Sequence, residues 1–479
     1  MKDSRNSFSG SFGFVLAAAG SAVGLGNIWR FPTLAARDGG GLFLLIYVVL
    51  ALTFGFTLLI TEIAIGRRSQ QGPLTAYAFF NKKWAFIGLF SFVIPAIIYP
   101  YYCVIGGWVM KYLWTYLTFS GNDAVADDYF GGFITAQWSP LMFLVLFSAM
   151  CFYVVYRGVE KGIEKSSRII MPMLLVLVVF ICVYSLFISH TDANGVTRTG
   201  IEGAAYYFIP NFEGVTVNRF LKITLDATGQ LFYSLSIAMG IMIAYGSYMK
   251  RDVNLGQAVD RIEICDTAIA ILAGLMIIPA VYVFSGVDGM KAGPGLIFIS
   301  LPKVFDSLGA FGAIIGLAFF LLVLFAAMTS AVSILEACVS GVMDKFHWSR
   351  KKSVVIMGIY GIIMAVIVCL GYNTLYFEYE LPNGAVGQIL DIFDYISNNL
   401  LMPICAICTC ILFGWVAGPR LLIGEMKMNG YNFPRKTMYV IMLKFIVPVM
   451  LVILLVVSLI PTEVFDAYLE KFLTVFGVN

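Results

Sequence analysis

Charged side chains are scarce in this sequence. Asp, Glu, Lys and Arg together make up 12% of the 479 residues, whereas soluble domains average roughly 25%. Hydrophobic residues make up 60%, and the mean hydropathy is +0.88. This composition excludes a soluble globular protein. Apolar runs near the roughly 20 residues that span a bilayer recur from end to end, so the chain is expected to cross the membrane many times.

Residues suited to catalysis or metal chemistry are also few. The two histidines, His190 and His347, fall in predicted loops, and the nine cysteines lie mostly inside apolar runs without a disulfide pattern. There is no Ser/His/Asp or Cys/His set and no zinc spacing, and the glycine-rich stretch after Gly20 lacks the Lys-Ser/Thr of a phosphate-binding loop. We therefore expect neither an enzyme nor an ATP-driven pump, and no nucleic-acid partner.

The apolar runs predict an all-α polytopic membrane protein with about 11 transmembrane helices. Lys and Arg gather in alternate loops, which places those loops and the N-terminus in the cytoplasm and the C-terminus outside. We expect the protein in the cell inner (plasma) membrane. The predicted spans are about 10–36, 41–66, 86–117, 140–156, 167–189, 219–248, 258–285, 310–342, 353–372, 388–414 and 437–460.

The stretch from Gly20 to Pro32 is a poor helix inside the first apolar run. Each of its three glycines weakens a helix by about 1 kcal/mol relative to Ala, and Pro32 removes a hydrogen-bond donor. Freed backbone groups cannot face lipid, so a break here must line a cavity. A small-xxx-small packing face is the alternative, but it does not explain Asn27 and Arg30 in the same segment.

Residues 229–240 in the sixth span repeat this mixture of glycines and polar residues. Interrupted helices five spans apart point to a secondary transporter built from two inverted five-helix repeats, with its site where the repeats meet. We therefore predict one transmembrane domain, 1–479, with repeat one at about 10–189, repeat two at about 219–414 and an extra helix at about 437–460.

A broken helix offers amides at a positive dipole end and carbonyl oxygens at the other, which suits a small zwitterion bound with cations. The amides near Gly24–Gly26 would hold a carboxylate. Carbonyls around Gly20–Val23 and the hydroxyls of Ser234, Thr329 and Ser330 are hard oxygen ligands for a hard cation. For Thr329 and Ser330, a bond back to the helix's own carbonyls is the alternative.

Three further charges lie in or beside spans. Arg30, just outward of the candidate site, and Asp394, at the outer start of span ten, are predicted to form an external gate. Glu62 either bonds to a backbone break or takes part in transport.

Several motifs together resemble the neurotransmitter:sodium symporter family, whose fold is that of the bacterial leucine transporter, with a 5+5 inverted repeat and unwound helices 1 and 6. The resemblance covers residues 5–460. It is carried by Gly20-x-Ala22-Val23-Gly24-Leu25-Gly26-Asn27-x-x-Arg30-Phe31-Pro32, Gly39-Gly40-Gly41, Pro100-Tyr101-Tyr102, Gln230-x-Phe232-Tyr233-Ser234-Leu235-Ser236 and Thr329-Ser330.

The resemblance implies two Na⁺ sites and a substrate pocket. One sodium site would use Ala22, Asn27, Ser234 and Asp266, and the other Gly20, Val23, Ala326, Thr329 and Ser330. Tyr102 would bind the substrate carboxylate, and Tyr233 would cover the substrate. The full expected set of substrate-binding residues is Ser21, Ala22, Gly24, Leu25, Gly26, Ile98, Tyr102, Tyr233, Ser234, Ser236, Met239, Ala331 and Ile334.

The resemblance also implies an internal gate of Arg5, Tyr248 and Asp344, with Phe8 in place of the family's usual Trp. Gly162 and Pro172 match the spacing with which relatives unwind the inner end of span five, although Gly162 would equally serve to close the preceding loop. Chloride is not expected, because Asp266 would supply the negative charge that animal relatives take from a chloride ion. The alternatives are that Asp266 caps the inner end of its helix, and that Cys265 is the matching residue.

The sequence therefore predicts sodium-coupled secondary active import of a neutral, hydrophobic or aromatic amino acid by alternating access. A symporter for another small amine or amino-acid derivative is the alternative, although an amine without a carboxylate would leave Tyr102 unpaired. A sodium channel would need a continuous polar pore, which the spans lack. The expected partners are the amino-acid substrate, sodium ions and the lipid bilayer, with the protein a monomer or weak dimer.

Overall fold

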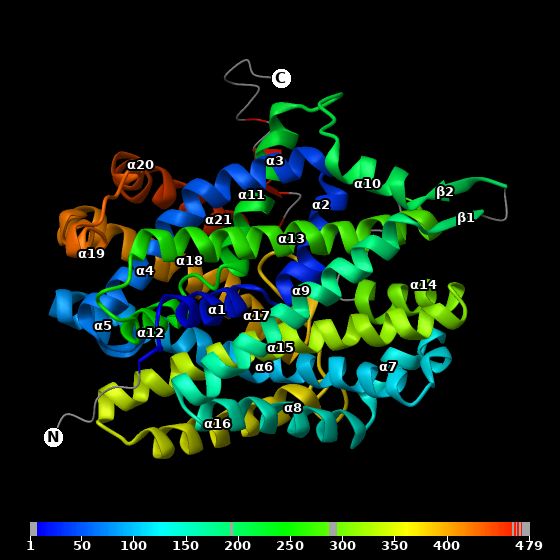
Figure 1. Cartoon of the computed structure of the whole chain (residues 1–479), viewed down its shortest axis with the longest axis horizontal. Coiled ribbons are helices and arrows are strands. Elements are labelled where there is room, and N and C mark those ends of the chain that lie inside the picture. The colour runs from blue at the N-terminus through cyan, green and yellow to red at the C-terminus, as the bar shows by residue number, and fades with distance from the viewer. Residues whose placement is uncertain are drawn as a thin grey trace.

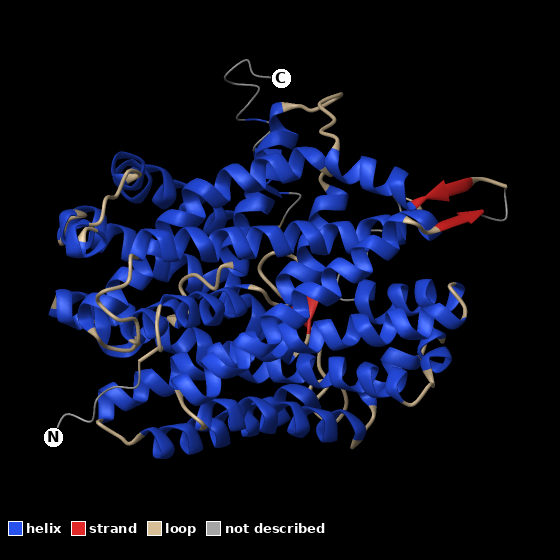
Figure 2. Ribbon diagram, viewed as in Figure 1, coloured by secondary structure: helices blue, strands red, loops and turns tan. Residues whose placement is uncertain are grey.

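The computed structural model describes residues 7–191, 195–286, 295–461, 464–465, 467–468 and 471. Within them the chain is almost entirely helical, and the long helices lie side by side (Figures 1 and 2). The short helices α5 and α19 lie at one end of the bundle, and α7, α14 and the hairpin β1–β2 lie at the other. The two small hairpins pair β1 (Ser189–Thr191) with β2 (Thr197–Thr199) and β3 (Tyr379–Glu380) with β4 (Val386–Gly387).

The α-helices, in chain order, are α1 Ser11–Ala22, α2 Phe31–Arg37, α3 Gly41–Leu50, α4 Phe56–Ser69, α5 Pro73–Phe80, α6 Phe86–Leu117, α7 Tyr129–Thr135, α8 Ser139–Tyr156, α9 Lys165–Leu186, α10 Gly200–Phe208, α11 Val217–Ser234, α12 Ile241–Ser247, α13 Leu255–Ser285, α14 Leu301–Ser307, α15 Ala310–Phe346, α16 Arg350–Leu370, α17 Ile389–Asp394, α18 Met402–Ile411, α19 Arg420–Met426, α20 Lys436–Ile441 and α21 Val447–Leu459.

Nine continuous helical segments of the described residues are long and apolar enough to cross a membrane. A tenth span results if the bent pair Ser11–Ala22 and Gly26–Arg37 counts as one. The predicted sixth span, 219–248, is not among them, because α11 and α12 are separate helices and α11 carries charged residues. The nine continuous segments are Gly41–Ser69, Lys82–Leu117, Ser139–Tyr156, Val159–Leu186, Leu255–Phe284, Phe311–Phe346, Arg350–Leu370, Ile389–Val416 and Lys436–Leu459.

The predicted fifth span, about 167–189, starts earlier in the structure than the sequence predicted. Its helical residues begin at Val159 instead of about 167, so Gly162 lies inside the helix and not in the preceding loop. A Cβ at Gly162 would lie 2.0 Å from the carbonyl oxygen of Val154, which explains why glycine is needed here. Pro172 sits within α9, where it removes one backbone donor without ending the helix.

The first helix is interrupted within the predicted glycine-rich stretch. α1 ends at Ala22, Val23 is extended (φ −73°, ψ 97°), and helical structure resumes at Gly26 with a bend of 54°. Because α1 contacts α9, α13 and α15, the interruption lies deep inside the bundle. Its backbone groups therefore face protein, as the cost of exposing them to lipid requires.

A second interruption separates α11 from α12. Ser236 (φ 54°), Ala238 (φ 63°) and Gly240 (φ 68°) adopt left-handed conformations, which cost about 1–3 kcal/mol each for the two non-glycine residues. The Ala238 amide donates to Glu62 Oε1 at 2.6 Å, so a buried carboxylate on α4 satisfies one freed donor. Of the two roles considered for Glu62, binding to a backbone break is the one that the structure shows.

Candidate functional site

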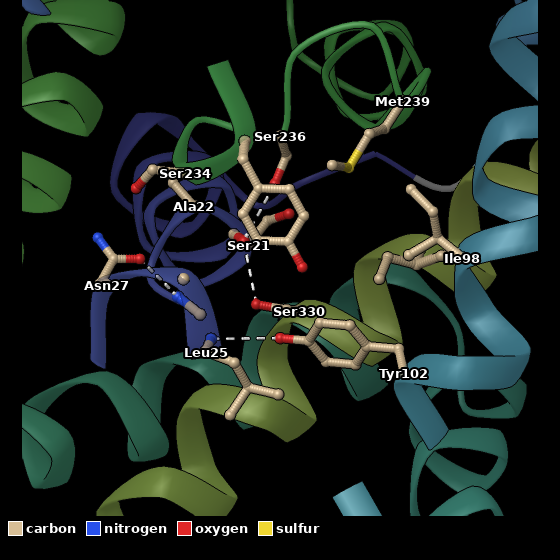
Figure 3. A pocket seen from close by; sticks show the side chains of 14 residues that line it. Ser21, Ala22, Leu25, Asn27, Ile98, Tyr102, Ser234, Ser236, Met239 and Ser330 are labelled. Atoms are coloured by element: carbon tan, nitrogen blue, oxygen red, sulfur yellow. Dashed lines mark hydrogen bonds between the residues drawn. The ribbon is translucent and has the colours of Figure 1, made fainter. Parts of the chain in front are cut away.

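A small cavity of about 20 Å³ lies where the two helix interruptions face α6 and α15 (Figure 3). All of the predicted substrate-binding residues line it except Ala331, which is buried nearby on α15. The lining residues are Ser21, Ala22, Gly24, Leu25, Gly26, Asn27, Ile98, Tyr102, Tyr233, Ser234, Ser236, Met239, Ser330 and Ile334.

One end of the cavity carries hydrogen-bond donors. The Leu25 amide donates to the Tyr102 hydroxyl at 3.4 Å (Figure 3), and Ser330 is a further hydrogen-bond neighbour of this hydroxyl, whose proton can turn to Ser330 or to a ligand oxygen. Gly24 and Gly26 allow close approach of their neighbours: a Cβ at Gly24 would lie 2.6 Å from Ser330 Oγ, and one at Gly26 would lie 2.8 Å from Tyr233 Cδ1. Glycine at both positions therefore lets two helices and a tyrosine ring enclose the same space.

The opposite end is mainly apolar. Ile98 from α6, Ile334 from α15 and Met239 from the second interruption supply its wall. Two hydroxyls lie beside it: Ser236 Oγ donates to the Ser21 carbonyl at 3.3 Å, and Ser21 Oγ is buried without a hydrogen-bond partner. None of the residues that line the cavity carries a charged side chain.

A carboxylate lies just behind the cavity. Asp266 is fully buried, and its Oδ1 accepts from Asn27 Nδ2 at 2.8 Å and from Ser234 Oγ at 2.9 Å, whereas its Oδ2 has no hydrogen-bond partner. A buried carboxylate is costly unless a positive charge accompanies it, so these residues fit a bound cation. Asn27 Oδ1 accepts from the Gly24 amide at 3.0 Å and keeps a second lone pair for an ion.

The alternative role of Asp266 as a helix cap is not what the structure shows. α13 begins at Leu255, and its N-cap is Asn254, whose side chain accepts from the Gln257 amide. Asp266 lies well inside α13, where it points at the first interruption instead of at the helix end. Cys265, the competing match, is only partly buried.

A second group of oxygens gathers between α1 and α15. Ser330 Oγ reaches the Ser21 carbonyl at 3.1 Å and the Val23 carbonyl at 3.5 Å, so it does not simply bond back to its own helix. Thr329 Oγ1 does bond back, to the Phe325 and Ala326 carbonyls, both at 3.1 Å. Gly20 lies beside this group, since a Cβ there would lie 3.5 Å from Thr329 Cβ. Neutral carbonyl and hydroxyl oxygens of this kind suit a hard cation.

The predicted external gate is not closed by an ion pair. Among the residues that the structure describes, Arg30 forms no ion pair with Asp394; its guanidinium lies 5.8 Å from the centre of the Tyr233 ring. Asp394 Oδ1 instead accepts from Asn398 Nδ2 at 2.5 Å. Arg30 and Tyr233 also line a second cavity, of about 130 Å³, together with Asp226 and Asn398.

The opposite side of the site is closed by packing and hydrogen bonds. Phe8 is buried, with its ring 5.5 Å from that of Phe14 and 5.6 Å from that of Tyr245. The Ser9 amide donates to Glu164 Oε2 at 2.8 Å. Of the predicted internal gate, Arg5 lies outside the described residues, and the other two residues make the contacts given next.

Tyr248 donates its hydroxyl to Glu336 Oε1 at 2.7 Å, and Asp344 accepts from the Gly72 amide. Glu336 is fully buried and also pairs with Arg350. Sequence reasoning missed Glu336 and Arg350. A carboxylate inside the apolar eighth span was the available signal, because such residues are rare there and need a partner.

Comparisons of this chain with known proteins agree on one protein family. A model of the sodium:neurotransmitter symporter family matches residues 5–124 and 134–472. An uncharacterized sodium-dependent transporter of Bacillus subtilis, YhdH, is 32% identical over 453 residues, which cover 93% of this chain and 96% of that protein. The human sodium- and chloride-dependent GABA transporter 2 is 25% identical over 485 residues, which cover 89% of this chain and 76% of that one.

A solved structure also matches over nearly the whole chain. The crystal structure of MhsT in complex with L-phenylalanine is 34% identical to this chain, with a TM-score of 0.81. The match covers 95% of this chain and 100% of that one.

Proposed function

Because the chain belongs to the sodium:neurotransmitter symporter family, we propose that it imports a neutral amino acid with a hydrophobic or aromatic side chain by alternating access. Sodium-dependent transport across a membrane is the activity of this family, so the chain is a transporter and not an enzyme. The substrate class, the ion sites and the transport cycle are our proposals, and the contacts around the cavity support them.

The observation that carries the proposal is the polarity of the cavity. One end offers the Tyr102 hydroxyl, which suits a carboxylate. The other end offers Ile98, Met239 and Ile334 and no charged side chain, so a charged substrate side chain would be buried without a partner. MhsT, the structural relative, was solved with L-phenylalanine.

We propose two sodium ions. The first would bind at Asp266, Asn27, Ser234 and the Ala22 carbonyl beside the substrate carboxylate; the second would bind at Thr329, Ser330 and the carbonyls of Gly20, Val23 and Ala326. Each ion would supply positive charge where the structure holds oxygen atoms and no cationic side chain. The unpartnered Oδ2 of Asp266 supports a built-in negative charge, so chloride would not be needed.

Alternating access would expose this site to each side in turn. The structure is closed on the side of Phe8 and Ser9, and the larger cavity lies on the side of Arg30, above Tyr233. Closure by Arg30 and Asp394 would then require these two side chains to approach each other. We further propose the cell inner membrane, a cytoplasmic N-terminus, an outer C-terminus, a monomer or weak dimer, and the two-repeat division given above.

Thermal stabilisation of the purified protein tests the substrate class. We would measure Tm with each of the twenty amino acids, in sodium and in potassium buffer. Neutral amino acids with hydrophobic or aromatic side chains should raise Tm in sodium alone, because binding to the native state shifts unfolding by mass action. Stabilisation by a charged amino acid, or by an amine without a carboxylate, in place of these would contradict the proposal.

A further inference from the structure

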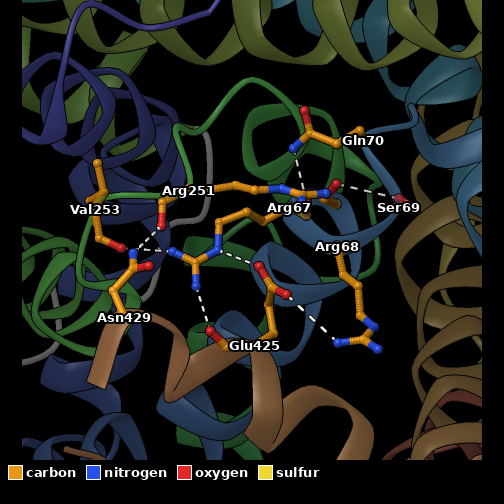
Figure 4. Close-up of polar contacts among 9 residues, drawn as sticks. Arg67, Arg68, Ser69, Gln70, Arg251, Val253, Glu425 and Asn429 are labelled. Carbon is orange, nitrogen blue, oxygen red and sulfur yellow. Dashed lines mark hydrogen bonds and ion pairs between the residues drawn. The ribbon is translucent and has the colours of Figure 1, made fainter. Parts of the chain in front are cut away.

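Arg67, in the last turn of α4, is the centre of a buried cluster at the end of the bundle that holds α5 and α12 (Figure 4). Its side chain is 1% exposed. Its Nε donates to Glu425 Oε1 at 2.8 Å and its Nη2 to the Glu425 carbonyl at 2.6 Å, whereas its Nη1 donates to the Val253 carbonyl at 2.7 Å. One guanidinium therefore joins α4, α19 and the loop between α12 and α13.

The loop between α12 and α13 is held at three consecutive carbonyls. Asn429 Nδ2 donates to the Arg251 carbonyl at 2.7 Å, the Tyr431 hydroxyl to the Asp252 carbonyl at 2.9 Å, and Arg67 to that of Val253. Two of these three donors belong to residues 420–431, which we call the α19 segment. This segment connects the spans that contain α18 and α20.

α12 itself lies directly on α4. A Cβ at Gly66 would lie 1.9 Å from the Ile243 carbonyl oxygen, and one at Gly246 would lie 2.4 Å from that of Ile63, so the two backbones touch through glycines. Glu62 on α4 holds the Ala238 amide just before α12 begins. Thus α12, the second half of the interrupted sixth helix, is attached to α4 at three places: through Ala238 just before α12, along the length of α12, and through Val253 after α12.

A second buried arginine ties together a different set of helices. Arg350, at the start of α16, donates to both carboxylate oxygens of Glu336 on α15 and, through Nη2, to the Val155 carbonyl of α8 at 3.0 Å. The hydroxyl of Tyr248, just after α12, reaches Glu336 from the first set. When this hydroxyl leaves, Glu336 keeps its arginine. Separation of Arg67 from Glu425 would leave the buried Arg67 without a carboxylate and Glu425 with only Arg68, whose Nη1 lies 3.8 Å from Glu425 Oε2 (Figure 4).

We infer that the α19 segment moves as one body with α4 and α12 during the transport cycle, and that Arg67 and Glu425 are the positioning pair that holds it there. The helices α8, α15 and α16 form the other body at this end of the bundle, and the contact between Tyr248 and Glu336 is one that opens. This inference rests on the alternating access proposed above.

Distances between spin labels test this assignment. Labels are placed on cysteines introduced at Asp252, Lys427 and Lys351, whose side chains are exposed and take no part in either cluster, and the protein without added cysteines gives the labelling background. Between sodium with substrate and sodium-free buffer, the 252–427 distance should stay constant. The 252–351 and 427–351 distances should both change.

A constant 427–351 distance together with a changing 252–351 distance would overturn the inference and leave alternating access intact. If neither distance to 351 changes, alternating access at this side fails, and the inference fails with it. These two failures are therefore distinguishable.

Glu425→Gln tests the positioning role. The amide keeps one acceptor for Arg67 but loses the charge, so the 252–427 distribution should broaden, and turnover per folded molecule should fall at least threefold with substrate Kd within twofold. Glu160→Gln, at an exposed carboxylate on the same side, is the matched control and should change neither quantity. A Glu425→Gln protein with lower Tm but unchanged turnover per folded molecule would show a structural role only and would overturn the assignment.

Discussion

Tyr102→Phe removes one hydroxyl from the donor end of the cavity. In the structure this oxygen accepts a long bond of 3.4 Å from the Leu25 amide, and Tyr102 is 4% exposed. The hydroxyl proton can turn to Ser330 or to a ligand oxygen, and a carboxylate as the ligand makes the bond charge-assisted. Loss of such a bond costs about 1.5–3 kcal/mol, which corresponds to a Kd roughly 10- to 150-fold weaker.

The measurement is equilibrium binding, in saturating sodium, of the amino acid that stabilises the wild-type protein most. Tyr112→Phe is the matched control, because its hydroxyl is also buried but donates to the Phe298 carbonyl at 2.7 Å, away from the cavity. The control should lower Tm and leave Kd unchanged. A Tyr102→Phe protein whose Kd stays within threefold of wild type would refute a carboxylate partner for this hydroxyl.

Three further predictions concern the ions and the cycle. Asn27→Ala should abolish sodium-coupled uptake in a folded protein, because Asp266 loses one hydrogen bond and the ion loses a neutral oxygen; normal sodium-dependent uptake into proteoliposomes would argue against this site. Replacement of chloride by gluconate should leave wild-type uptake unchanged, whereas Asp266→Asn should either stop uptake or make it respond to chloride. Wild-type uptake that needs chloride would show that Asp266 does not supply the negative charge. Pro172→Ala should slow turnover several-fold and leave the substrate Kd nearly unchanged. The alanine restores a backbone hydrogen bond, worth about 0.5–1.5 kcal/mol, which opposes unwinding of the helix end near Gly162. Turnover equal to that of the wild type would indicate that Gly162 and Pro172 serve packing alone.

Much of the architecture follows from local patterns. Apolar runs of bilayer length make helices wherever they occur, because a backbone in lipid must satisfy its own hydrogen bonds, so the helical class could be predicted from composition. The glycines after Gly20 and those of 229–240 mark where helices stop, because glycine and polar residues cost helical stability inside an apolar run. These are properties of short stretches, and they need no knowledge of what packs against them.

Which of two roles a residue takes depended on its neighbours. For Asp266 the sequence left a helix cap as the alternative, and the structure shows that α13 begins eleven residues before it, with Asn254 as the N-cap. For Glu62 the contact with a backbone break depends on Ala238, far along the chain, which brings an amide to the carboxylate. Both contacts depend on where another part of the fold lies, and the hydrophobic periodicity of the sequence does not indicate that position.

The buried arginines show the same limit most clearly. Arg67 lies at the end of a predicted span, and the positive-inside pattern predicts a cytoplasmic position for it without indicating its burial. Charge counts along the chain predict the side of the membrane. Burial and pairing are set by tertiary packing, which brings α4, α19 and the loop after α12 together around one guanidinium.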